Sequence, residues 1–281
     1  MLSSINYFWA AYYGWTFTNP ETYIIECTVL ISVSVLFYGI FGRSSRVGEM
    51  TRYLALWIGG APVTMVFTYL LASLRFPVID SALNNFDNAL GFNWLNWYHF
   101  VNAHAAVKFV LHAAYATTTL QIIFSILYFS HREEGSRNNR LWWTAIISLV
   151  ITTIVSGILP AMGTFEYYGV ADAQHGVHLH DLHALLAGTL TSVSLDHMQG
   201  IVTLPSYHTV CAILLTYIYR NQRRMLFVVV PLNLLALVAI PSEGGHYLAD
   251  MLAGAAVAAS SIWIVEYAAS RLGCRNSING Y

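Results

Sequence analysis

The chain has 281 residues, of which 57% are hydrophobic and 10% are charged, and its mean hydropathy is +0.55. Soluble domains average about 25% charged residues, so this composition excludes an ordinary soluble fold and predicts a membrane protein. The formal net charge of -1 gives no basic balance of the kind that nucleic-acid-binding proteins carry.

The first twenty residues lack the basic stretch and apolar core of a cleavable signal peptide, and they are rich in Tyr, Phe and Trp. Amphipathic rings settle at the headgroup level of a bilayer, so we expect an interfacial segment there. Seven apolar stretches follow, and a membrane-spanning helix needs about 20 such residues. The sequence therefore predicts an all-α membrane bundle of six or seven transmembrane helices, with a buried or re-entrant helix as the alternative for any one span. The expected spans are 22–41, 53–74, 106–129, 141–161, 204–220, 225–242 and 247–269.

Arginine is concentrated in alternate loops of this predicted bundle. It occurs between spans one and two, three and four, and five and six, and again after span seven, while acidic residues and most histidines lie in the opposite loops. Because cytoplasmic loops are enriched in Arg and Lys, we expect the arginine loops to be cytoplasmic. Residues 162–203 and the outer ends of spans five and seven would then be non-cytoplasmic. The compact loops favour a bacterial inner membrane, in which that side faces the periplasm.

Two short polar segments lie on this predicted non-cytoplasmic side, 204–209 (LPSYHT) and 243–250 (EGGHYLAD). His246 and Asp250 are four residues apart, so they share one face of a helix. The carboxylate can accept the Nδ1 proton of His246, which fixes the tautomer and leaves the other ring nitrogen basic. His208 would stand on a different helix at the same membrane face, and two such imidazoles form a nucleophile and acid pair. The alternative is a pair of interfacial histidines with satisfied hydrogen bonds.

These segments resemble the second and third motifs of the type 2 phosphatidic acid phosphatase superfamily, which read PSGH and SRxxxxxHxxxD. Residues 205–208 (PSYH) resemble the former and residues 246–250 (HYLAD) the latter. The aromatic residue before His208 and the Gly-Gly-His-Tyr form are closer to the branch that contains inositol phosphorylceramide synthases and their bacterial relatives. The resemblance covers residues 80–269 and implies a six-helix catalytic core. It divides the single membrane domain, 1–281, into an N-terminal addition with the first span, 1–50, and a phosphatase-like core, 51–269.

The resemblance also implies a mechanism for phosphoryl transfer from a lipid. His246 attacks phosphorus to form a phosphohistidine, His208 protonates the leaving oxygen and then activates the acceptor, and Asp250 orients His246. Ser206 and nearby backbone amides bind phosphate oxygens, and the mechanism requires no metal or other cofactor. The acceptor is water in a phosphatase and an alcohol in a phosphotransferase. Further substrate-binding candidates in the two segments are Tyr207, Glu243 and Gly245.

The chain departs from the family pattern where that pattern places cations. No KxxxxxxRP motif occurs in residues 157–164, and Ile240 stands where the third motif has arginine. Phosphoryl transfer depends on charge stabilisation, so another group must replace these cations. Lys108 is the leading candidate, because it shares a predicted helix face with histidines four residues before and after it. A snorkelling lysine is the alternative, and Arg75 is the second candidate for the cation.

A second group of histidines lies in the segment before span five. Its spacing could bind Zn, supply phosphate contacts or form a pH-sensitive lid, and these possibilities stay open. Asp87, near the start of the family-like region, either lies at the membrane interface or reaches the site. The histidines of the second group are His175, His178, His180 and His183, and the accompanying acidic residues are Asp172 and Asp181.

The expected function is that of a lipid phosphatase or phosphotransferase, whose partners are the lipid phosphate substrate and the bilayer. Hydrolysis and transfer share the phosphoenzyme, so the motifs do not separate them. A phosphodiester carries about one negative charge and a monoester nearly two, so a site with few cations favours a diester and headgroup transfer of the inositol phosphorylceramide synthase kind. Two alternatives of other classes are a transporter with a histidine proton relay and a catalytically inactive lipid-binding relative.

Overall fold

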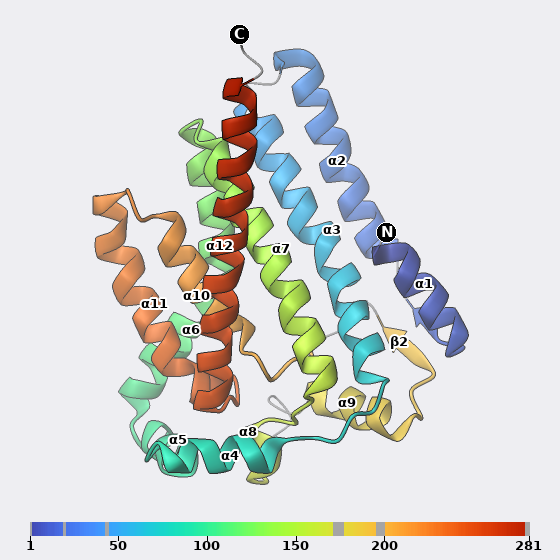
Figure 1. The fold of residues 1–281 in the computed structure, drawn as a ribbon, viewed down its shortest axis with the longest axis vertical. Helices are drawn as coiled ribbons and strands as arrows, with labels where there is room; N and C mark the ends of the chain where they lie inside the picture. Colours follow the sequence, from blue (N-terminus) through green and yellow to red (C-terminus); the bar gives the residue numbers. More distant parts are fainter. Residues whose placement is uncertain (1, 19–20, 43–44, 171–176, 195–199, 279–281) are drawn as a thin grey trace.

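The computed structural model describes residues 2–18, 21–42, 45–170, 177–194 and 200–278. Within these residues the chain forms twelve helices and two short strands (Figure 1). The helices are α1 (Leu2–Tyr12), α2 (Glu21–Phe41), α3 (Arg46–Ala72), α4 (Asp80–Ala89), α5 (Trp94–Ala103), α6 (Ala105–His131), α7 (Gly135–Ile158), α8 (Thr164–Tyr167), α9 (Val177–Ala187), α10 (Tyr207–Ile218), α11 (Arg223–Glu243) and α12 (Leu248–Ile278). The strands are β1 (Thr16–Thr18) and β2 (Ser192–Ser194).

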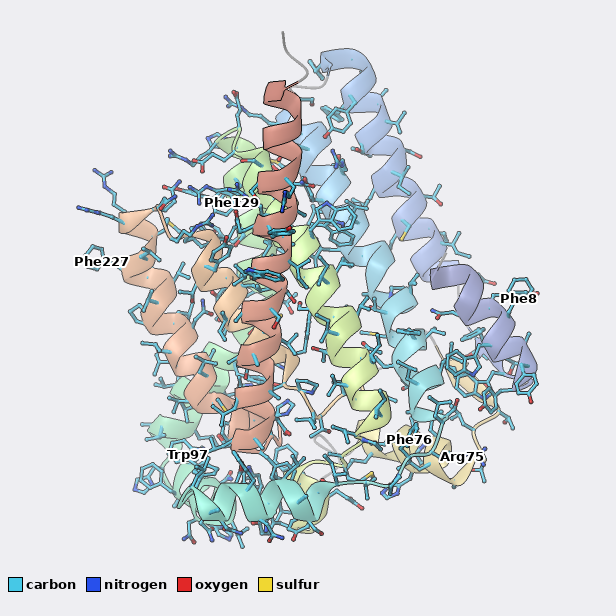
Figure 2. The ribbon with its side chains drawn as sticks, in the orientation of Figure 1. Phe8, Arg75, Phe76, Trp97, Phe129 and Phe227 are labelled. Atoms are coloured by element: carbon cyan, nitrogen blue, oxygen red, sulfur yellow. The ribbon has the colours of Figure 1, made fainter. Side chains whose placement is uncertain are left out.

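Six of the described helices, α2, α3, α6, α7, α11 and α12, are long and apolar enough to cross a membrane, and α10 is a shorter apolar helix. These seven helices coincide with the seven predicted spans, so the expected all-α membrane bundle is confirmed. Large apolar side chains project from the outer surface of the bundle, as Phe227 does from α11 with 83% exposure (Figure 2). Apolar surface of this kind suits lipid better than water, and the protein is an integral membrane protein.

The short helix α10 begins at Tyr207 rather than at the predicted position 204. Ser206 is its N-cap, and the Ser206 side chain accepts a hydrogen bond from the N–H of Thr209 at 3.4 Å. The helix has 12 residues, so it extends only about 18 Å, which is less than the roughly 30 Å of hydrocarbon in a bilayer. Its C-terminal end is anchored by Arg137, which donates to the carbonyl oxygen of Ile218 at 2.6 Å. The N-terminus of α10 therefore lies inside the bundle.

The arginine loops meet at one end of the bundle. Arg46, in the first turn of α3, pairs with Glu133 after α6 at 2.5 Å. Arg140 of α7 and Arg220, after α10, both pair with Glu266 of α12, at 3.4 and 3.3 Å. Loops that the sequence assigned to one membrane side are therefore close together in the fold.

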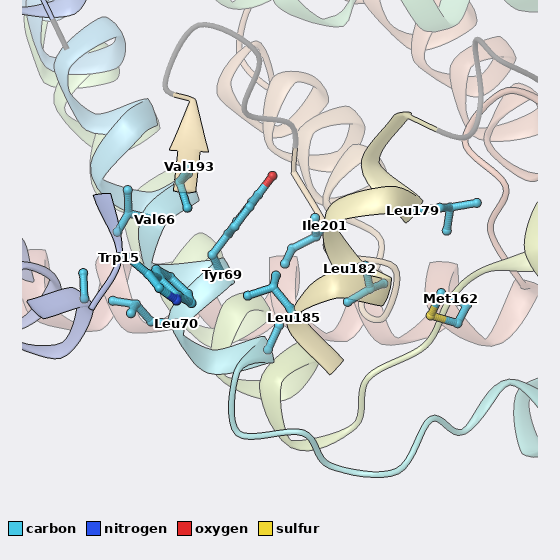
Figure 3. Close-up of a cluster of buried hydrophobic side chains, with 12 residues drawn as sticks. Trp15, Val66, Tyr69, Leu70, Met162, Leu179, Leu182, Leu185, Val193 and Ile201 are labelled. Carbon is cyan, nitrogen blue, oxygen red and sulfur yellow. The ribbon is translucent and has the colours of Figure 1, made fainter. Parts of the chain in front are cut away.

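The short helices α4, α5, α8 and α9 lie across the opposite end of the bundle (Figure 1). Near them, β1 pairs in parallel with β2, and Trp15 shares a buried apolar cluster with Tyr69 of α3 and Leu182 of α9 (Figure 3). The strand pair was not predicted, because three-residue strands are too short to show an alternating pattern. The loops at this end carry the two polar motif segments.

Candidate active site

His246 and Asp250 form a buried pair at the start of α12. Nδ1 of His246 lies 3.2 Å from Oδ2 of Asp250, and the two residues are 5% and 0% exposed. Gly245, with φ of +64°, turns the chain between α11 and α12, a conformation that glycine adopts without strain. Oδ2 of Asp250 also accepts the N–H of Tyr247 at 2.9 Å, so the carboxylate is fixed. A proton on Nδ1 of His246 then leaves Nε2 available as a nucleophile.

Ser206 joins the two motif segments through the backbone. Its N–H donates to the carbonyl oxygen of Asp250 at 2.9 Å, and a Cβ at Gly254 would lie only 2.5 Å from the Ser206 carbonyl oxygen. The N-terminal ends of α10 and α12 approach this closely because Gly254 has no side chain. The Ser206 side chain is buried and caps α10. Its oxygen therefore positions the helix of His208 by accepting a backbone N–H, and the hydroxyl keeps a proton that it can donate.

His208 faces Tyr115 of α6. The hydroxyl of Tyr115 lies 3.1 Å from Nδ1 of His208, and the two rings stack with 4.3 Å between their centroids. A Cβ placed on Gly244 would lie 2.8 Å from Cδ2 of His246 and 3.0 Å from the Tyr115 hydroxyl. Because Cδ2 is bonded to Nε2, the reactive edge of His246 borders the same space as that hydroxyl. The structure thus brings the histidines of the two segments together around Tyr115.

Tyr115 lies between the motif histidines, and the sequence analysis did not single it out. It follows His112 by three residues and Lys108 by seven, so the three side chains share one face of α6. That spacing was the available signal, because it makes Tyr115 the third polar group on a face of a membrane-spanning helix. The contact between Tyr115 and His208 spans 93 positions in the sequence and depends on how α6 packs beside α10.

Glu243 and His112 form a second carboxylate–imidazole pair beside the first. Nδ1 of His112 lies 2.7 Å from Oε2 of Glu243, and the side chains are 58% and 9% exposed respectively. Glu243 directly precedes Gly244, and His112 lies one turn of α6 from Tyr115. This pair therefore lies beside the two motif histidines, with His112 on the exposed side, and Glu243 brings a further carboxylate to them.

The two predicted replacements for the missing cations lie away from the motif histidines. Lys108 is exposed, and its ammonium donates to Oδ1 of Asn102 at 2.8 Å. Seven residues of helix put it about 10 Å along α6 from Tyr115, so its placement does not support a shared cavity with His246. The guanidinium of Arg75 lies against Gly188, where a Cβ would come within 2.1 Å of it.

Tyr207 and Gly245 have roles in packing and chain direction in this structure. The hydroxyl of Tyr207 donates to the carbonyl oxygen of Ala145 in α7 at 3.1 Å, so it does not point to His208, and substrate binding by this hydroxyl finds no support. The carbonyl oxygen of Gly245 accepts the N–H of Thr164 at 2.8 Å, which ties the start of α8 to the His246 loop.

Of the two positions predicted for Asp87, at the membrane interface or at the site, the structure shows the second. Its carboxylate accepts the N–H groups of Leu248 and Ala249 at 2.8 and 3.0 Å, and the side chain is buried. Burial raises the pKa of Asp87, while the two backbone hydrogen bonds act in the opposite direction. The first N–H groups of α12 donate to Asp87 and Asp250, so they are not donors for a phosphate.

Asp80 holds the same region from the other end of α4. It is buried, and its carboxylate accepts the hydroxyl of Tyr247 at 3.1 Å and the N–H groups of Met162 and Gly163 at 2.9 and 2.8 Å. Met162 and Gly163 lie within residues 157–164, where the family pattern would place its first, cationic motif. Here a carboxylate occupies the neighbourhood instead, and it fixes the loop through backbone hydrogen bonds.

The second histidine group is only partly described. His175, Asp172 and the side chain of His178 lie outside the described residues. Nε2 of His183 lies 3.0 Å from Oε1 of Glu166, and Nδ1 of His180 lies 3.4 Å from Oδ1 of Asp181, whose Oδ2 accepts the hydroxyl of Tyr69 at 2.6 Å. Among the side chains that the structure describes, no three metal-ligating groups come together, so a metal site gains no support there.

A comparison with protein families matches residues 81–264 of the chain to the PAP2 superfamily. The matched region begins in α4 and ends in α12, so it contains both motif segments, Tyr115 and Asp87. Asp80, the first residue of α4, lies directly before it. No curated protein and no solved structure shows significant similarity to the chain.

Proposed function

The chain belongs to the PAP2 superfamily, and on that premise we propose that it is a lipid phosphatase or phosphotransferase that works through a phosphohistidine on His246. The proposal rests on one observation. His246, which is hydrogen-bonded to a carboxylate, and His208, from another helix, both lie next to the hydroxyl of Tyr115. A nucleophile oriented by a carboxylate and an acid beside it are the groups that a covalent phosphoryl transfer needs.

The proposed reaction has two steps. In the first, Nε2 of His246 forms a bond to phosphorus while the bond from phosphorus to the leaving oxygen breaks, and Nε2–H of His208 gives its proton to that oxygen. In the second, the acceptor oxygen bonds to phosphorus, the nitrogen–phosphorus bond breaks, and His208 takes the acceptor's proton. Asp250 holds Nδ1–H of His246 throughout, so the ring is oriented in both steps.

The charges around the site favour a phosphodiester over a phosphomonoester substrate. Glu243, Asp250 and Asp87 bring carboxylates close to the histidines, whereas Lys108 is at the rim. A monoester brings nearly two negative charges and a diester about one, so the electrostatic cost of binding is smaller for the diester. We therefore propose headgroup transfer or headgroup hydrolysis as the leading form of the activity. The arginine distribution supports a site on the non-cytoplasmic side, which would be the periplasmic face of a bacterial inner membrane.

The test is turnover of defined lipids by the full-length protein in lipid nanodiscs. Phosphatidic acid serves as the monoester and phosphatidylinositol as the diester, each with and without an added alcohol acceptor. We expect His208→Asn to lower turnover roughly 100- to 10,000-fold and His246→Asn to abolish it. His131→Asn is the matched control, because His131 is an exposed histidine at the arginine end of α6. Turnover that survives His246→Asn, or no turnover of either lipid class, would refute the proposal.

A further inference from the structure

The hydroxyl of Tyr115 occupies the space between the two motif histidines. It lies 3.1 Å from Nδ1 of His208, and a Cβ at Gly244 would touch both this hydroxyl and Cδ2 of His246, at 3.0 and 2.8 Å. A phenol oxygen can accept one hydrogen bond and donate another at the same time. Tyr115 and His208 are both half-buried, so this space is partly desolvated but not closed.

Resting on the phosphohistidine mechanism above, we propose that Tyr115 is a catalytic residue that takes the place of the missing cation. Its oxygen accepts a hydrogen bond from Nδ1–H of His208, and its own O–H donates a hydrogen bond to a phosphoryl oxygen beside His246. This hydrogen bond strengthens as negative charge develops on that oxygen in the transition state. Tyr115 keeps its proton in both steps, so it acts as a neutral donor throughout the cycle.

The same contact sets the tautomer of His208. In the part of the chain that the structure describes, Nδ1 of His208 bonds to Tyr115 and not to a carboxylate. With Nδ1–H held by the Tyr115 oxygen, Nε2 is the nitrogen that gives its proton to the leaving oxygen in the first step. The lone pair left on Nε2 then accepts the proton of the acceptor hydroxyl in the second step. One tyrosine therefore supports both the acid and the base role of His208.

The neighbouring groups explain why a neutral donor is needed at this position. The N–H groups at the start of α12 donate to Asp87 and Asp250, and the Ser206 hydroxyl caps α10. These N–H groups are used within the protein, whereas the Tyr115 proton becomes available once its oxygen accepts a hydrogen bond from His208. In a partly desolvated site such a hydrogen bond is stronger than it would be in water.

The test compares two tyrosine-to-phenylalanine variants in the full-length protein. Tyr115→Phe removes the hydroxyl and retains the ring that stacks on His208. Tyr219→Phe is the matched control, because the Tyr219 hydroxyl also links α10 to α6, by donating to Ser125 at 3.0 Å, at the other end of α10. The measurement is the single-turnover rate of phosphoenzyme formation from phosphatidylinositol and phosphatidic acid carrying radioactive phosphorus, with kcat and KM from steady-state assays.

We expect Tyr115→Phe to slow phosphoenzyme formation and kcat roughly 100- to 1000-fold while KM changes by less than about threefold. Tyr219→Phe should leave each of these quantities within about threefold of the wild type. A wild-type rate in Tyr115→Phe, or an equal loss in both variants, would overturn the role of Tyr115 and leave the phosphohistidine mechanism intact. If the wild-type protein forms no phosphoenzyme, or if His246→Asn still forms one, the proposed function is overturned, and the role of Tyr115 with it.

Discussion

Asp87 accepts a hydrogen bond from the N–H of Leu248 at 2.8 Å, across 161 positions of sequence. Its second carboxylate oxygen accepts the N–H of Ala249 at 3.0 Å. A helix outside the membrane spans therefore caps the first turn of the helix that carries Asp250. The geometry of the His246 pair depends on α4 as well as on the motif itself.

Replacing Asp87 tests this dependence. Asp87→Ala leaves two buried N–H groups without their acceptor, which should cost roughly 1–3 kcal/mol of stability and lower kcat by loosening the His246–Asp250 pair. Asp87→Asn retains one acceptor oxygen, so its effects should be intermediate. The measurements are the unfolding midpoint in detergent and kcat at a temperature where each variant is folded. Asn88→Ala, at an exposed neighbour on α4, is the control, and an Asp87→Ala enzyme with the same kcat as Asn88→Ala would contradict the account.

Glu243→Gln tests the proposed preference for a phosphodiester. The change removes one negative charge beside the motif histidines and keeps a side chain of the same shape next to His112. Removing one carboxylate charge near the bound phosphate should change its binding free energy by about 1 kcal/mol in a partly solvated site, or roughly fivefold in the binding constant. KM for phosphatidic acid should therefore fall several-fold more than KM for phosphatidylinositol. Equal changes for the two lipids would show that the carboxylate does not select between them.

Lys108→Met tests whether Lys108 takes part in the reaction or lies outside the site. The sequence placed Lys108 in the cavity of His246, and a large loss of turnover would follow from that position. In the structure its ammonium is exposed and bonds to Asn102, and such exposed charges contribute little. We now expect kcat/KM to fall by no more than about threefold. A loss of roughly 100-fold or more at unchanged stability would return Lys108 to the site.

The membrane orientation has its own test in cysteine labelling. In a variant with Cys27, Cys211 and Cys274 replaced by alanine, a cysteine introduced at Asn88 should react with an impermeant maleimide added to intact cells. A cysteine introduced at Arg223 should react only after the membrane is opened, because the arginine loops are expected to be cytoplasmic. The reverse pattern of protection would place the site on the cytoplasmic side.

The spans and the motif pair could be predicted because their signals are local. Apolar stretches of about 20 residues define membrane helices, and the spacing of His246 and Asp250 puts them on one helix face. The alternation of arginine loops placed His208 at the same end of the bundle as His246, and the structure brings these histidines together.

The remaining parts of the site depend on packing between helices that are distant in the sequence. Asp87 caps a helix from outside it, and Tyr115 meets His208 only because α6 packs beside α10. Lys108 shows a different limit, because helix periodicity gives the face on which a residue lies but not its depth along the helix axis. At about 1.5 Å per residue, Lys108 is on the face of Tyr115 but at the rim.

The most direct test of the central claim is to identify the residue that carries phosphorus during turnover. The wild-type protein in nanodiscs would be mixed with its lipid substrate, quenched in base because phosphohistidine is labile in acid, and digested for mass spectrometry. We predict that His246 carries a phosphoryl group when phosphatidic acid is the substrate, and an inositol-phosphoryl group when phosphatidylinositol is the substrate. The adduct should be absent in His246→Asn and should persist in His208→Asn once formed, because the acceptor is no longer activated in the second step. Phosphorus on any other residue, or turnover with no phosphorylated peptide in a rapidly quenched sample, would contradict the account.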